Sequence, residues 1–144
     1  MVIDASALLA ILQDGPERAA FNRAIESAET CSMSAASFVE ISIVIESRHG
    51  REGIRDLDLY VAKSGITLVP VDEDQAYIAR QAFSRYGKGR HTAGLNFGDC
   101  FSYALAKLLG EPLLCKGEDF PAADIGISCT DQGAVQPLQP NQNV

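Results

Sequence analysis

The chain has 144 residues, of which 47% are hydrophobic and 22% are charged, and its formal net charge is −7. Such a composition indicates one globular domain that can bury a core, and no apolar run is long enough to cross a bilayer. A net charge of this sign excludes nucleic-acid binding through the overall field of the protein, so such binding would need a local basic patch or bound metal ions.

Apolar runs and helical periodicities alternate along the chain. The first run, residues 1–4, predicts a buried strand that ends at Asp4. Further strands are expected at residues 30–33, 66–71, 112–115 and 124–128. Helices are expected between them at residues 5–14, 16–29, 35–50, 51–65, 72–87 and 99–110.

Local signals mark the ends of these helices. Pro16 occupies a first helical position, Ser34 (or, as the weaker choice, Ser37) caps the third helix, and Asp72 caps the fifth. Glycines are expected to end four helices, at Gly50, Gly65, Gly87 and Gly110.

Short apolar strands separated by pairs of helices predict an α/β fold. The expected architecture is a three-layer α/β/α domain whose central sheet is mostly parallel and covered on both faces. It should span residues 1–130, followed by a polar, proline-containing tail at residues 131–144 that is expected to be mobile.

The four cysteines show no CxxC spacing and lie in apolar surroundings, at Cys31, Cys100, Cys115 and Cys129. This pattern predicts reduced core residues rather than disulfides or a zinc site. The N-terminal stretch has no basic region and carries Asp4 within its apolar part, which argues against export. The sequence therefore predicts a cytoplasmic protein with no membrane association.

Acidic residues stand at the edges of the predicted elements. Asp4 ends the first strand, Asp99 opens the last helix, and Asp119 follows the strand at residues 112–115. Because ligands of parallel sheets bind outside the carboxyl ends of the strands, these three acids can meet at one edge. Glu40 is a fourth candidate, since a carboxylate in an apolar helix is costly unless it is paired or binds a cation.

A cluster of carboxylates suits hard cations such as Mg²⁺ or Mn²⁺, which can activate water and stabilise the leaving oxygen of a phosphodiester. Each acid also has a simpler interpretation. Asp99 could cap a helix, Asp4 could accept hydrogen bonds from the following helix, and Asp119 could be an ordinary turn residue. Glu40 could form an ion pair with Arg48 or Lys107.

Four segments together resemble a known family. They read MVIDASALLAIL, SAASFVEISIVIE, LNFGDCFSYALAK and PLLCKGEDF, and they resemble the PIN domain, most closely the VapC-type toxins of bacterial toxin–antitoxin pairs. The resemblance implies a metal-dependent endoribonuclease that forms a homodimer and is neutralised by a cognate VapB-type antitoxin.

The same resemblance assigns the site residues. The acidic positions of the family fall on Asp4, Glu40 and Asp99, and its hydroxyl position falls on Ser6, which would hold a metal-bound water or orient Asp4. Many members carry the fourth acid where this chain has Gly117. That role is therefore expected of Asp119, with Glu118 as the alternative.

Basic residues precede the last helix. Arg85, Lys88 and Arg90, with Phe83 and Tyr86 among them, could contact RNA phosphates and stack a base. They could equally form a solvated helix end.

Lys116 is closer in sequence to the acidic site, and a phosphate or carboxylate contact is expected of it.

Two other functions are compatible with parts of the sequence. One is a catalytically weak module that regulates through antitoxin and operator binding, and the other is a small-molecule phosphatase. Position 6 is Ser, so the early DxD of such a phosphatase is missing.

Overall fold

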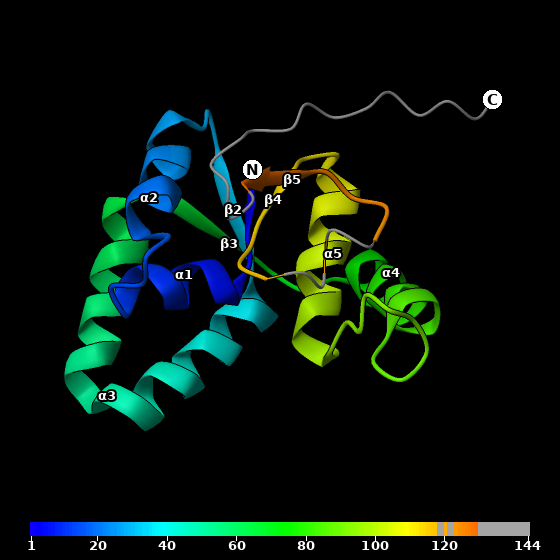
Figure 1. Cartoon of the computed structure of the whole chain (residues 1–144), viewed down its shortest axis with the longest axis horizontal. Helices are drawn as coiled ribbons and strands as arrows, with labels where there is room; N and C mark the ends of the chain where they lie inside the picture. The colour runs from blue at the N-terminus through cyan, green and yellow to red at the C-terminus, as the bar shows by residue number, and fades with distance from the viewer. Residues whose placement is uncertain (118–119, 121–122, 130–144) are drawn as a thin grey trace.

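The computed structural model describes residues 1–117, 120 and 123–129, and of residues 128 and 129 only the backbone (Figure 1). Residues 118–119, 121–122 and 130–144 lie outside the description. The two candidates for the fourth acid, Glu118 and Asp119, and the tail at 131–144 therefore remain sequence predictions.

A parallel sheet forms the centre of the molecule. Its strands are β1 (Val2–Ile3), β2 (Cys31–Ser34), β3 (Ile66–Val69), β4 (Leu113–Leu114) and β5 (Ile127–Cys129). The strand order is β3-β2-β1-β4-β5, and every neighbouring pair is parallel. In the register, Val2 lies opposite Ser32 on β2 and opposite Leu113 on β4.

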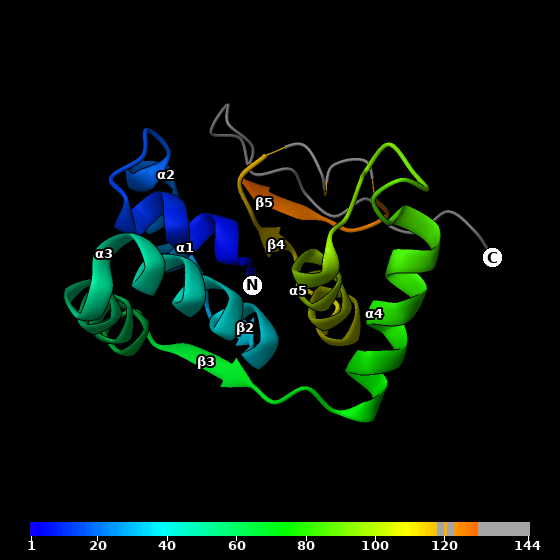
Figure 2. The ribbon, with the colours of Figure 1, turned by 90° about the horizontal axis from the view of Figure 1, so that it is seen from below.

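Helices cover both faces of this sheet. They are α1 (Ala5–Leu12), α2 (Arg18–Ser27), α3 (Ala35–Lys63), α4 (Glu73–Tyr86) and α5 (Phe97–Leu109). Figure 2 shows α1, α2 and α3 on one side of the sheet and α4 and α5 on the other. The predicted three-layer α/β/α fold and its order of elements are confirmed.

Successive residues of a strand pack into two separate hydrophobic cores, one on each face of the sheet. Ile3 and Leu114 pack among the helices α1, α2 and α3, whereas Val2 and Leu113 pack against the helices α4 and α5. All four side chains are fully buried. Successive side chains of a strand point to opposite faces, so a sheet covered on both faces needs apolar residues in unbroken runs.

Several predicted helix ends differ from the structure, two of them at Pro16 and Gly50. The helix α2 begins at Arg18, so Pro16 precedes it and the expected first helical position was wrong. The predicted boundary at Gly50 is a bend within α3, and its two limbs are visible in Figure 1. Gly50 has φ 61° and ψ −150°, a conformation that residues with a Cβ rarely adopt. Ser34 and Asp72 cap α3 and α4 as predicted.

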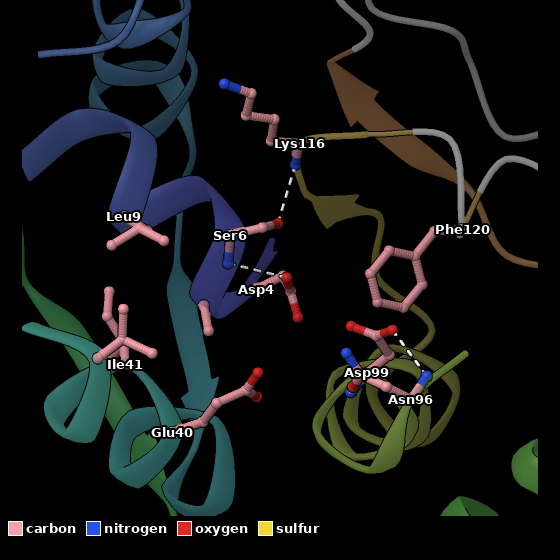
Figure 3. A pocket seen from close by; sticks show the side chains of 11 residues that line it. Asp4, Ser6, Leu9, Glu40, Ile41, Asn96, Asp99, Lys116 and Phe120 are labelled. Carbon is pink, nitrogen blue, oxygen red and sulfur yellow. Dashed lines mark hydrogen bonds between the residues drawn. The ribbon is translucent and has the colours of Figure 1, made fainter. Parts of the chain in front are cut away.

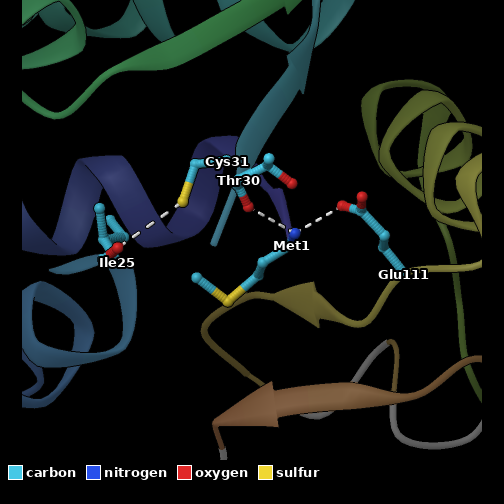
Figure 4. A network of polar contacts seen from close by, with 5 residues as sticks. All are labelled: Met1, Ile25, Thr30, Cys31 and Glu111. Atoms are coloured by element: carbon cyan, nitrogen blue, oxygen red, sulfur yellow. Dashed lines mark hydrogen bonds and ion pairs between the residues drawn. The ribbon is translucent and has the colours of Figure 1, made fainter. Parts of the chain in front are cut away.

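The amino group of Met1 is held at the start of β1. It donates a hydrogen bond to the carbonyl of Thr30 at 2.7 Å and forms an ion pair with Glu111 (Figure 4). Beside it, the thiol of Cys31 contacts the carbonyl of Ile25. These contacts fix β1, whose far end carries Asp4.

The cysteine prediction is confirmed for the three whose side chains are described. Cys31, Cys100 and Cys115 are buried and form no disulfide. Within the described ranges, no helix is both long enough and apolar enough to span a membrane.

Candidate active site

A pocket of about 210 Å³ opens at the carboxyl ends of β1 and β4. The chain crosses from β1 to β2 and β3 on one side and returns to β4 on the other, so this is the point where the strand order reverses. Open parallel sheets bind ligands at such points. Eleven residues line the pocket: Asp4, Ala5, Ser6, Leu9, Glu40, Ile41, Val44, Asn96, Asp99, Lys116 and Phe120 (Figure 3).

Both carboxylate oxygens of Asp4 accept hydrogen bonds. One oxygen accepts a hydrogen bond from the backbone N–H of Ser6 at 2.9 Å, which caps α1, and the other accepts one from the hydroxyl of Ser102 at 2.6 Å. The hydroxyls of Ser102 and Ser37 lie 3.0 Å apart. The predicted hydrogen bond from the following helix exists, and it leaves the carboxylate facing the pocket.

Ser6 links the two strands that flank the pocket. Its hydroxyl accepts a hydrogen bond from the backbone N–H of Lys116 at 3.0 Å. The Ser6 hydroxyl, which was expected to orient Asp4 or hold a metal-bound water, bonds to Lys116 instead, and Ser6 contacts Asp4 through its backbone amide.

Asp99 does not open its helix, which corrects the sequence prediction. The helix α5 begins at Phe97 and its N-cap is Asn96. The side chain of Asn96 accepts from the N–H of Asp99, and the side chain of Asp99 accepts from the N–H of Asn96, both at 2.9 Å. This capping box fixes the Asp99 carboxylate at a helix N-terminus, where the helix dipole favours negative charge.

Glu40 projects from α3 into the same pocket (Figure 3). Burial, and secondarily the charge of Asp4, raise the pKa of Glu40. The ion pairs considered for it do not form, because Arg48 donates to Gln13 and Lys107 pairs with Asp124. Among the described residues, none donates a hydrogen bond to this carboxylate.

Gly98 gives the Glu40 carboxylate its space, and the sequence reasoning missed it. A Cβ built on Gly98 would overlap both oxygens of Glu40. The reasoning also missed Asn96 and Ser102, which hold Asp99 and Asp4. Asn96 could have been found from the sequence, because a common capping residue followed three positions later by an acid is the spacing of a capping box. The sequence held no signal for Ser102, which lies 98 positions from Asp4.

The donor chemistry of the pocket fits a hard divalent cation. Asp4, Glu40 and Asp99 supply oxygen ligands of the kind that Mg²⁺ and Mn²⁺ prefer. As the side chains lie, no three His, Cys, Asp or Glu side chains of the described ranges are arranged to hold one ion. Glu40 accepts no hydrogen bond from the described residues, and Asp4, Glu40 and Asp99 are the residues that would hold such an ion.

The basic residues divide into two groups. Lys116 lines the pocket as expected. Arg85, Lys88 and Arg90 are exposed on the end of α4 and the segment after it, and none of them lines the pocket. Arg85 lies over the ring of Tyr86 and Arg90 over the ring of Phe83, with 5.5 Å and 5.4 Å to the ring centroids.

Comparison with known proteins decides the family. The sequence matches the PIN domain over residues 1–126. The chain belongs to the PIN-domain family. It is 56% identical over 125 residues to the ribonuclease VapC of Mycolicibacterium smegmatis, a match that covers 87% of this chain and 97% of that relative. The resemblance to VapC-type PIN toxins is thereby confirmed.

Solved structures share the fold of this PIN domain. The crystal structure of VapC20 from Mycobacterium tuberculosis, described as a toxin that cleaves the sarcin–ricin loop, matches with a TM-score of 0.71 at 18% identity, and the match covers 86% of this chain and 95% of that one. A toxin–antitoxin complex from Klebsiella pneumoniae matches with a TM-score of 0.61 at 19% identity, covering 96% and 98%. At these identities the likeness concerns the fold alone.

Proposed function

We propose that this chain is a metal-dependent endoribonuclease toxin that hydrolyses RNA phosphodiester bonds. The convergence of Asp4, Glu40 and Asp99 on one pocket at the edge of the sheet carries the proposal. The high identity to a VapC ribonuclease over most of the chain supports the same activity.

A bound Mg²⁺ or Mn²⁺ would supply the activation of water and the stabilisation of the leaving oxygen. Hydrogen bonds from Ser6 and Ser102 orient the Asp4 carboxylate toward the site of such an ion, and a hydrogen bond from Asn96 orients that of Asp99. Asp119, or else Glu118, completes the set of acids in this proposal. Hydrolysis would leave products with 5′-phosphate and 3′-hydroxyl ends.

RNA would be held beyond the pocket by the exposed basic residues. Arg85, Lys88 and Arg90 would contact phosphates, which carry most of the affinity for nucleic acids. The rings of Phe83 and Tyr86 lie under two of these side chains. In a protein of net charge −7, such a local patch and the bound cation would bring the RNA to the site.

An antitoxin of the VapB type would restrain the activity. The fold shared with a solved toxin–antitoxin complex supports such a partner. An Arg or Lys of the antitoxin could pair with the carboxylates of the pocket.

The active form would be a homodimer in the cytoplasm. Exposed apolar side chains on α3 and α5, namely Val39, Ile43 and Phe97, are 55%, 61% and 78% exposed and support a further contact surface. The buried reduced thiols of Cys31 and Cys100 suit a reducing compartment.

Cleavage of total RNA by the purified chain tests the function. We expect cleavage that requires Mg²⁺ or Mn²⁺ and falls at least about a hundredfold in Asp4→Asn. Asp14→Asn, which removes an exposed carboxylate outside the pocket, should cleave normally. Equal cleavage by wild type and Asp4→Asn would contradict the proposal. A wild type that binds an antitoxin and operator DNA but cuts no RNA would favour the regulatory module.

A further inference from the structure

Lys116 lines the acidic pocket, yet its ammonium group turns away from it. Its side chain points away from Asp4, Glu40 and Asp99 in Figure 3. The ammonium instead forms an ion pair at 3.1 Å with Glu17, which lies between α1 and α2. The Lys116 ammonium therefore pairs with Glu17 rather than with Asp4, Glu40 or Asp99, which line the same pocket as Lys116.

Glu17 is an unusual partner because its carboxylate is largely buried. Its side chain is only 13% exposed, compared with 45% for that of Lys116. The second carboxylate oxygen of Glu17 is buried without a hydrogen-bond partner within the described ranges. A hydrogen bond from the Glu17 backbone N–H and the charge of Lys116 nevertheless lower the pKa of Glu17, so its carboxylate is charged and Lys116 is its cationic partner.

Gly15 makes this burial possible. A Cβ added at Gly15 would lie 2.9 Å from the buried oxygen of Glu17, and 3.1 Å from the carbonyl oxygen of Ala10. Any side chain there would press on the Glu17 carboxylate. The glycine therefore leaves room for the Glu17 carboxylate beside the carbonyl of Ala10.

A hydrogen bond ties the backbone of Lys116 to the pocket wall. Its N–H donates to the hydroxyl of Ser6, and Asp4 lies two residues before Ser6. The flexible four-carbon stem of a lysine carries a compact charge, and only its far end is free to move. Among the described residues, the acids that line the same pocket as Lys116 are Asp4, Glu40 and Asp99, and no described residue donates a hydrogen bond to Glu40.

We propose that Glu17 is a positioning residue that keeps the Lys116 ammonium out of the metal-binding pocket. A lysine released into the pocket would pair with Asp4 or Glu40 and compete with the divalent cation for them. The inference rests on the proposed function, because it requires that the pocket binds such a cation.

Calorimetric titration of the full-length chain with Mn²⁺ tests this inference, and it reads metal affinity rather than activity. The variants are Glu17→Gln, Lys116→Met and the double variant, each compared with wild type. Asp14→Asn is the matched control, since it removes one carboxylate from the same connecting segment but pairs with Arg18 rather than with Lys116.

We expect Glu17→Gln to weaken Mn²⁺ binding about fivefold when Lys116 is present, the scale of a partly exposed ion pair. In the Lys116→Met background the same substitution should change binding less than about twofold, as should Asp14→Asn. The comparison within each background separates competition by the lysine from a general effect of charge.

Other results would overturn the inference. If Glu17→Gln weakens binding equally in both backgrounds, its carboxylate acts through charge alone. If wild type binds Mn²⁺ and Glu17→Gln binds it equally well, the ion pair is only structural and the proposed function stands. If wild type binds no Mn²⁺, the proposed function and this inference both fail.

Discussion

The carboxylates of the pocket are held in two different ways. Asp4 and Asp99 accept short hydrogen bonds from neighbouring backbone and hydroxyl groups, which fix their orientation. Glu40 comes from the opposite wall and accepts none from the described residues. The first two are preorganised ligands, whereas Glu40 is a half-buried carboxylate that no described hydrogen bond fixes and that can adapt its position; its raised pKa means that the fold disfavours its charged form.

The difference follows from where each residue lies in its element. Asp4 and Asp99 stand at helix N-termini, where unpaired backbone N–H groups are available. Glu40 lies within α3, where the backbone amides already bond within the helix.

Gly98→Ala should have the largest effect, because it acts on the adaptable carboxylate. The added methyl group would overlap the oxygens of Glu40 and force that side chain away. We expect RNA cleavage to fall about tenfold to a hundredfold and stability to fall by about 1–3 kcal/mol, as in overpacked cores. Cleavage rates and thermal unfolding measure the two effects.

A double variant checks the cause of the Gly98 effect. In Gly98→Ala with Glu40→Ala, the clash is gone and stability should return, since alanine otherwise favours a helix over glycine. If the double variant stays as unstable as Gly98→Ala, the methyl group clashes with something other than Glu40.

Ser102→Ala should have an intermediate effect, because it loosens a held carboxylate. Asp4 loses one of its two hydrogen bonds, so we expect about a tenfold loss of divalent-ion affinity and a stability loss of about 1 kcal/mol. Ser47→Ala is the control, since that hydroxyl bonds only to a helix carbonyl at the surface. Unchanged metal affinity in Ser102→Ala would mean that the backbone of Ser6 alone orients Asp4.

Glu40→Gln should have the smallest effect on stability of the three substitutions, and it should raise stability rather than lower it. The raised pKa of Glu40 means that folding disfavours its charged form, so wild type is destabilised at pH values above that pKa. The destabilisation is relieved as the pH falls through the raised pKa. In metal-free buffer at neutral pH the neutral variant should therefore melt at a higher temperature than wild type.

The pH dependence supplies the control for Glu40→Gln. The two melting temperatures should converge as the pH falls toward 4.5, the ordinary pKa of a glutamate. A variant that is less stable than wild type at neutral pH would show that Glu40 has a stabilising partner.

Much of the fold could be predicted from local patterns. The apolar runs around Ile3 and Leu114 identified buried parallel strands, and the topology then brought Asp4, Glu40 and Asp99 together. The helix start at Asn96 was missed because Asp99 is itself a common capping residue, and the two signals overlap three residues apart.

Contacts between distant segments could not be predicted in this way. Ser102 and Asp4 meet only after α5 packs beside β1, and the need for Gly98 depends on how close α3 approaches α5. Lys116 was expected at the acidic site, but its pairing with Glu17 follows from the turn before α2. The distance of Arg85, Lys88 and Arg90 from the pocket likewise depends on the course of the chain after α4.

Titration of wild type and Asp99→Asn with Mg²⁺ or Mn²⁺ tests whether Asp4, Glu40 and Asp99 form a divalent-cation site. Asparagine keeps an oxygen that can accept from the N–H of Asn96, so the capping box and the fold should survive. We expect the melting temperature of wild type to rise with the cation and that of Asp99→Asn to stay nearly constant. An equal rise in both proteins, or none in wild type, would contradict the claim.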